Sequence, residues 1–384
     1  MTERDEKQSP WKVVPAPGDG KDRASPLASK SPPRSVGATL AALAALVLGT
    51  FLQTPPAQAD AVEDFLDALR VKVSAAEKVN RSVIAGKDGW LFFVPELRSL
   101  SVGPFWGERA TAVSRSSKPE YADPLPAIVD FHEQLKKADI ELLVVPVPAK
   151  AATYPDRLAP EVGLGASQRR CDPRQQEFYE LLGKRGVNVV DLLPLFVEHR
   201  GEAAGMYCHT DTHWSGAAAA LAAKAIADRV RDRAWLKERK PAKYDVETRE
   251  QEISGDLARL LDESQPARER LPLSFVGLRE GGALVPVKPD RNSPVLLMGD
   301  SHTLVFHDPE LFARGAGLPD HLALQLGAPV DLVGVRGSGA TTTRIELLRR
   351  RDNLKGKKLV VWCFSFREFT ESFTGWRKVP VIKE

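Results

Sequence analysis

Residues 294–301 read PVLLMGDS. The short apolar run predicts a buried strand, and the glycine after it permits a tight turn at the strand's carboxyl end. We expect a helix to follow Ser301, so that the serine side chain lies exposed at the edge of a sheet while backbone N–H groups face a developing oxyanion. A loop serine that only caps a helix explains the same residues equally well.

Short apolar runs alternate with helical stretches on both sides of this segment. Strands are predicted at residues 140–148, 187–192, 330–337 and 358–364. Helices are predicted at residues 124–139, 172–186, 215–236 and 341–352, with Ser215 as the N-cap of the third. This alternation predicts an α/β fold in which helices cover both faces of a mostly parallel sheet. Ligand sites of such sheets lie at the carboxyl ends of the strands, so residues just after each strand are the candidates for chemistry.

The N-terminal residues predict a membrane segment ahead of the folded body. Residues 1–34 are polar, proline-rich and charged, which predicts a disordered cytoplasmic arm. Residues 35–52 carry no charge and are about long enough to cross a bilayer as a helix. Basic residues precede this segment and acidic residues follow it, which places the rest of the chain outside the cytoplasm. Ala57-Gln58-Ala59 resembles a signal-peptidase site, so a transmembrane anchor and a cleaved signal both stay open, with a buried core helix as a third alternative.

Residues 60–384 are expected to form the folded domain. Residues 61–82 have the apolar spacing of an amphipathic helix, and residues 86–97 (GKDGWLFFVPEL) predict a turn that leads into a short aromatic strand. Residues 101–124 are predicted to be a surface loop. Residues 238–292 are strongly charged and predict an irregular insertion or lid.

Charge and cysteine content exclude some classes of protein. The 384 residues include 54 Lys and Arg against 51 Asp and Glu, a net charge of +3, so no overall field favours nucleic acid and we expect no nucleic-acid partner. The three cysteines cannot make a disulfide framework. Outside the cytoplasm, a single bridge between Cys171 and Cys208 would be permitted.

Residues 207–215 read YCHTDTHWS and form the second candidate element. Asp211 and His213 can lie on one side of a loop, where the carboxylate holds the imidazole in one tautomer and leaves its other nitrogen free to deprotonate a serine. A solvated loop that caps the alanine-rich helix is the structural alternative. Metal binding by Cys208, His209, Asp211 and His213 is a second alternative, but no other cluster supplies matched ligands, and we expect no metal or other cofactor.

Two further strand ends carry weaker signals. Arg336-Gly337-Ser338-Gly339 follows a predicted strand, and its glycines would let backbone approach a ligand closely. Lys150 and Tyr154 follow the strand at residues 140–148 in the same way. Gly337, Gly339, Arg336, Lys150 and Tyr154 are therefore candidate oxyanion or substrate residues, although a simple turn explains the glycine segment as well.

Taken together, the Gly-Asp-Ser and Asp-x-His elements resemble the SGNH hydrolase superfamily. The Asp-x-His precedes the serine, as in the AlgJ/AlgX-type alginate O-acetyltransferases. The further segments that resemble this family are GKDGWLFF (86–93), ELLVVPVPAKAATYPDRL (141–158), GMYCHTDTHWSGAAA (205–219), SGDLARLLD (254–262), VLLMGDS (295–301) and KKLVVWCFSFRE (357–368).

The resemblance implies an SGNH-like, flavodoxin-like fold in which Ser301 is the nucleophile, His213 the general base and Asp211 its orienting carboxylate. It also implies acetylation of an exopolysaccharide outside the cytoplasmic membrane, with acetyl groups delivered by a membrane-bound acyltransferase. The usual Gly-x-Asn-Asp source of oxyanion donors is missing from the sequence, and His302 has no assigned role.

The residues leave two other functions open. A carbohydrate acetyl-esterase would use the same triad with water as the acceptor. A non-catalytic polysaccharide-binding protein could keep the fold and stack sugars on Trp106, Tyr121, Trp214 or Trp235, although packing explains each of these aromatic side chains too.

Overall fold

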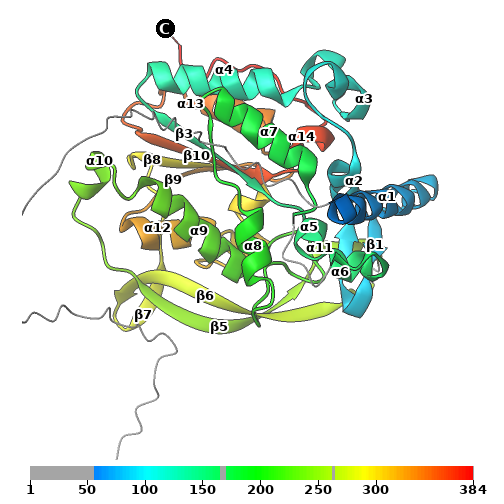
Figure 1. Cartoon of the computed structure of the whole chain (residues 1–384). Helices are drawn as coiled ribbons and strands as arrows, with labels where there is room; N and C mark the ends of the chain where they lie inside the picture. Colours follow the sequence, from blue (N-terminus) through cyan, green and yellow to red (C-terminus); the bar gives the residue numbers. More distant parts are fainter. Residues whose placement is uncertain (1–55, 165–169, 262–263, 384) are drawn as a thin grey trace, which may run out of the picture. The chain divides into compact units, whose positions relative to one another are not determined.

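The computed structural model describes residues 56–164, 170–261 and 264–383. Its central sheet has the strand order β4-β3-β10-β8-β9, and every neighbouring pair is parallel, which confirms the predicted α/β architecture (Figure 1). The strands are β3 (Glu141–Val147), β4 (Asn188–Val189), β8 (Val295–Gly299), β9 (Asp331–Gly334) and β10 (Leu359–Ser365).

The middle of this sheet is fully buried. Every residue of β8 and β10 is buried, as expected for parallel strands that are covered on both faces. Gly299 at the end of β8 lies opposite Cys363, and a Cβ atom on Gly299 would lie 1.6 Å from the Cys363 carbonyl oxygen. Only glycine fits there, and this close approach brings the carboxyl ends of β8 and β10 together.

Helices cover both faces of the sheet, as the sequence predicts. Figure 1 shows α4 (Pro124–Lys137), α7 (Pro173–Lys184) and α13 (Thr341–Arg350) on one side, with α9 (Gly216–Val230) and α12 (Leu318–Leu326) on the other. The predicted N-cap of α9 is confirmed, because the Ser215 hydroxyl accepts a hydrogen bond from the Ala218 N–H at 3.1 Å.

The described part of the chain begins with α1 (Pro56–Lys78), which packs on α2 (Val94–Ser101). Between them, β1 (Val83–Ala85) and β2 (Leu91–Phe93) pair antiparallel around the predicted turn at Lys87–Gly89. The remaining helices are short, namely α3 (Ala110–Val113), α5 (Lys150–Thr153), α6 (Pro155–Leu158), α8 (Leu193–His199), α10 (Ala234–Lys237), α11 (Asp256–Leu261) and α14 (Glu368–Glu371).

Three strands form within the described part of residues 238–292. β5 (Asp245–Ser254), β6 (Arg268–Glu280) and β7 (Ala283–Pro286) pair antiparallel, and we call residues 245–286, with α11 among them, the charged arm. The prediction of irregular structure is wrong because most side chains of β5 are exposed, so the strand lacks the apolar alternation of a half-buried one. Pairing with β6 and ion pairs such as Arg268–Glu252, at 2.8 Å, support it instead. That these residues are an insertion stays a prediction.

One local expectation is also wrong, and one question that the sequence leaves open is answered. A short 3₁₀ turn, Ser301–Thr303, replaces the helix expected after Ser301, because the chain reaches a left-handed conformation at Phe306 (φ 62°) that a right-handed helix cannot continue through. Cys171 and Cys208 do not pair. Each is a free, buried thiol, and the two sulfurs contact the carbonyl oxygens of Ala152 and Trp214 respectively.

The predicted arm at residues 1–34 and the predicted membrane segment at 35–52 lie outside the described residues. Within the ranges that the structure describes, no helix combines the length and apolar character needed to cross a bilayer.

Candidate active site

Ser301 lies directly after β8, at the carboxyl end of the central sheet. Asp211 and His213 lie on the loop that leads into α9, which we call the Asp-His loop (residues 207–215). This loop folds back on itself, because Tyr207 and Trp214 form an antiparallel bridge and the Cys208 N–H donates to the His213 carbonyl at 3.3 Å.

A continuous chain of hydrogen bonds joins the three predicted catalytic side chains. His213 Nε2 lies 2.7 Å from Ser301 Oγ, although the two residues are 88 positions apart in the sequence. On the other side of the imidazole, His213 Nδ1 lies 2.6 Å from Asp211 Oδ1. Asp211 has no exposed surface, whereas Ser301 keeps 8% of its surface exposed. The order of contacts is therefore hydroxyl, imidazole, carboxylate, with the hydroxyl nearest to solvent.

Electrostatics favour a charged imidazole beside Asp211. Burial alone would lower the pKa of His213, but the Asp211 carboxylate outweighs burial and raises that pKa above its usual value. Burial likewise opposes ionisation of Asp211, yet His213 and the backbone N–H groups of His213 and Asp256 hold its pKa well below its usual range. The carboxylate thus stays ionised and can stabilise an imidazolium that forms when His213 takes a proton.

The buried ammonium group of Lys150 binds the Asp-His loop. Its Nζ donates to the carbonyl oxygens of Leu91 (2.7 Å), His209 (2.8 Å) and Asp211 (3.1 Å). Burial lowers the pKa of Lys150 to about 8, a fall that nearby acidic groups such as Glu96 and Asp211 limit. Lys150 was a candidate for substrate contact, but in the structure it ties β2 to the loop.

Two carboxylates of the charged arm, those of Glu269 and Asp256, accept hydrogen bonds from the same loop. Glu269 accepts from the N–H groups of His209 (2.8 Å) and Thr210 (2.9 Å) and from the Thr210 hydroxyl (2.7 Å). Asp256 accepts from the Thr212 N–H (2.8 Å) and hydroxyl (2.6 Å). Neither residue is predicted from the sequence. Asp256 lies in SGDLARLLD, one of the segments that resemble the family, but the sequence does not show which group its side chain contacts.

His302, which had no assigned role, lies in a second buried pair. The carboxylate of Asp300 accepts from the N–H groups of His302 (2.9 Å) and Ser365 (2.7 Å), and so joins the ends of β8 and β10. The His302 Nδ1 atom lies 3.3 Å from Asp300, and its ring centroid is 4.8 Å from that of His213. Burial lowers the pKa of His302 to about 4, so this imidazole is neutral at neutral pH.

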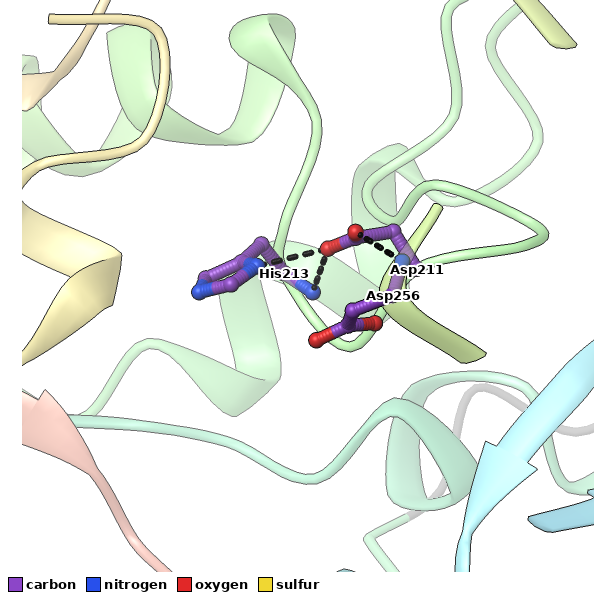
Figure 2. Close-up of side chains that lie close together, drawn as sticks. All are labelled: Asp211, His213 and Asp256. Carbon is purple, nitrogen blue, oxygen red and sulfur yellow. Dashed lines mark hydrogen bonds and ion pairs between the residues drawn. The ribbon is translucent and has the colours of Figure 1, made fainter. Parts of the chain in front are cut away.

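The side chains that could hold a cation are Asp211, His213 and Asp256, whose ligand atoms lie within 4.8 Å of one another. Figure 2 shows the Asp211 carboxylate between the other two residues, joined to the His213 imidazole and to the backbone nitrogens of both. All four carboxylate oxygens of Asp211 and Asp256 accept hydrogen bonds. Cys208 and His209, the other predicted metal ligands, point elsewhere: Cys208 contacts Trp214, and the His209 ring lies 4.2 Å from that of Trp90. The geometry favours a hydrogen-bond network over a metal centre.

Two of the remaining predicted substrate residues, Arg336 and Gly339, make contacts within the protein. Arg336 forms ion pairs with Asp308 and Glu310 at the surface. The Gly339 carbonyl accepts from the Trp362 indole at 2.7 Å, and its N–H donates to Glu368. Gly337 has a left-handed conformation (φ 76°), and a Cβ atom there would meet no other atom within 4 Å.

Tyr154 lies at the wall of a surface cavity of about 560 Å³, which also contains Arg157, Arg200 and Glu269. Its hydroxyl accepts from the Met206 N–H at 2.8 Å and donates to the Arg200 carbonyl at 3.1 Å. Among the aromatic residues suggested for sugar stacking, Trp214 is fully buried, so that expectation is wrong for Trp214. Trp106, Tyr121 and Trp235 are partly buried.

Comparisons with known proteins show the family to which the chain belongs. The family described as "SGNH hydrolase-like domain, acetyltransferase AlgX" matches residues 83–366. A protein of Pseudomonas aeruginosa named probable alginate O-acetylase AlgJ is 26% identical over 303 residues, which are 74% of this chain and 70% of that protein. A protein of the same name from Pseudomonas fluorescens is 25% identical over 294 residues, 74% of this chain and 68% of that protein.

Solved structures show the same fold. The O-acetyltransferase domain of Pseudomonas putida AlgJ matches 75% of this chain and 92% of its own length, with a TM-score of 0.54 and 21% identity. Pseudomonas aeruginosa AlgX matches 74% of this chain and 61% of its own length, with a TM-score of 0.52 and 16% identity. Because the family match spans most of the chain, from β1 to the turn after β10, the chain belongs to the SGNH hydrolase-like AlgX acetyltransferase family.

Proposed function

We propose that this chain is an O-acetyltransferase that modifies an extracytoplasmic polysaccharide through an acetyl-Ser301 intermediate. The observation that carries the proposal is the relay from Ser301 Oγ to His213 Nε2 (2.7 Å) and from His213 Nδ1 to Asp211 Oδ1 (2.6 Å). The first contact has the length that proton transfer from a nucleophile to a general base requires, and the second allows Asp211 to orient the imidazole.

In the first half-reaction, His213 Nε2 takes the proton of Ser301 while Ser301 Oγ bonds to the acetyl carbonyl carbon. The tetrahedral intermediate collapses when the bond to the donor's leaving oxygen breaks, and that oxygen receives the proton from His213. In the second half-reaction, His213 takes the proton of a sugar hydroxyl, whose oxygen attacks acetyl-Ser301. Ser301 Oγ then leaves and recovers the proton, so that the site returns to its starting state.

The oxyanion needs donors of its own. The Ser301 N–H is at the start of a 3₁₀ turn, where helical geometry provides no internal partner, and it is our first candidate. Gly337 stays a candidate for the second donor, whereas the Gly339 N–H is directed at Glu368.

The names of the relatives support the proposed acceptor. Proteins named alginate O-acetylase match most of the chain, so a polysaccharide acceptor is the corresponding proposal here. We extend the proposal to an acetyl donor supplied by a membrane-bound acyltransferase. We also propose that the protein acts outside the cytoplasm, and that the segment at residues 35–52 directs it there as an anchor or as a cleaved signal.

The test uses a small acetyl ester, 4-nitrophenyl acetate, with and without an oligosaccharide acceptor. Mass spectrometry of the acceptor distinguishes a transferase from an esterase, which would release acetate only. Ser301→Ala should reduce turnover of the ester by about 10³-fold or more, because the nucleophile acts as a unit with its base.

Ser274→Ala on β6, the matched control, should behave like the wild type. Wild-type turnover in Ser301→Ala would contradict the proposal. Sugar binding without any ester turnover would instead favour a binding protein of the same fold.

A further inference from the structure

The turn between β5 and α11 touches the Asp-His loop through its backbone and its side chain. The Asp256 N–H donates to Asp211 Oδ2 at 2.7 Å. The two side-chain oxygens of Asp256 accept from the Thr212 N–H and from the Thr212 hydroxyl. A single residue of the charged arm therefore binds both Asp211 and the residue between Asp211 and His213.

Gly255 allows this close contact. A Cβ atom at position 255 would lie 2.0 Å from the Thr210 carbonyl oxygen, so no side chain fits between the turn and the loop. One turn later, the Ala258 N–H donates to the same carbonyl at 3.0 Å, and the neighbouring Leu257 is fully buried. The turn is thus fixed against the loop by backbone, side-chain and core contacts.

We propose that Asp256 is a positioning residue for the acetyl-transfer reaction, which holds the Asp211 carboxylate and the Asp-His loop in the reactive arrangement. This inference rests on the proposed function. Because the Asp256 N–H occupies Asp211 Oδ2, the carboxylate cannot rotate freely, and Oδ1 stays directed at His213 Nδ1. The bonds to Thr212 fix the backbone between the two residues, so that His213 Nε2 stays directed at Ser301.

The Asp256 carboxylate also acts on His213 through its charge. Asp211 on its own loop and Asp256 on the arm both favour the protonated imidazole. Arg367, after β10, disfavours it. His302, after β8, and Lys150, on α5, are further titratable groups beside the Asp211–His213 pair. Removing the charge of Asp256 while keeping its shape should therefore lower the pKa of His213.

Asp256→Asn in the full-length chain tests this role, because asparagine keeps the backbone bond to Asp211 but loses the charge and one of the two acceptor oxygens that hold Thr212. We expect kcat for 4-nitrophenyl acetate to fall by about tenfold to a hundredfold, with a smaller change in KM. The acid limb of the pH profile of kcat/KM should move to lower pH. Asp64→Asn, the same chemical change on an exposed position of α1, should leave both quantities unchanged.

A second measurement does not depend on turnover. In the Ser301→Ala background, the NMR titration of the His213 imidazole should move to lower pH when Asp256→Asn is added. Unchanged kcat and an unchanged His213 titration would overturn the inference. If kcat and the melting temperature both fall but the His213 titration does not move, Asp256 has only a structural role. That result would also overturn the inference. If Ser301 proves dispensable for ester turnover, the proposed function fails, whereas the titration still reports on Asp256.

Discussion

Asp211–His213 and Asp300–His302 have the same Asp-x-His spacing and lie side by side, yet they differ in chemistry. In the first pair the carboxylate contacts the imidazole at 2.6 Å, and the pKa of His213 is raised. In the second pair the ring nitrogen of His302 lies 3.3 Å from the carboxylate, and burial lowers the pKa of His302 to about 4. Both carboxylates also accept hydrogen bonds from two backbone N–H groups. Spacing alone therefore does not make a base, because a close contact between the carboxylate and the ring nitrogen is also needed to favour the protonated imidazole.

The largest expected effect separates the two histidines. His213→Gln should reduce kcat/KM for 4-nitrophenyl acetate by about 10³-fold or more, because the variant lacks the proposed general base. His302→Gln should cost about tenfold or less, since His302 is neutral and packs against His213 and Trp214. Equal losses in the two variants, measured on samples with the same melting temperature as the wild type, would remove the distinction.

A smaller effect should separate the two aspartates. Asp211→Asn should lower kcat by about 10²- to 10³-fold with little change in stability, because the imidazole loses the charge that stabilises its protonated form. Asp300→Ala should destabilise the fold by about 2–4 kcal/mol, since two buried N–H groups lose their acceptor. Urea unfolding and steady-state kinetics measure both outcomes. A stable Asp300→Ala variant would show that β8 and β10 are held together by other contacts.

The smallest effect concerns stability as a function of pH. The folded-state pKa of His302 is about 4, below the value of about 6.5 for an unfolded chain, so the unfolded state binds the extra proton first. Between these values, stability should fall as the pH falls, by up to about 3 kcal/mol from this residue.

His302→Asn should flatten that part of the curve of unfolding free energy against pH relative to the wild type. An unchanged slope would show that His302 is already protonated in the folded protein at mildly acidic pH.

The sequence predicts the parts of the molecule whose signals are local. The apolar runs at β8 and β10 predict buried parallel strands, and the Asp-x-His spacing places Asp211 beside His213. Ser301 and His213 could be paired only by family resemblance, because nothing local relates residues that are 88 positions apart. β5 and the roles of Asp256 and Glu269 were missed, because charged side chains on an exposed strand show no apolar period, and a carboxylate's partner depends on tertiary structure.

The charged arm has a consequence for how activity is lost under stress. Glu269 and Asp256 together accept hydrogen bonds from three backbone N–H groups and two hydroxyls of the Asp-His loop. The parallel sheet makes no such contacts with these donors. Local unfolding of the arm would therefore release the Asp-His loop while the central sheet is still intact. Heat or denaturant should then abolish activity before the protein unfolds globally.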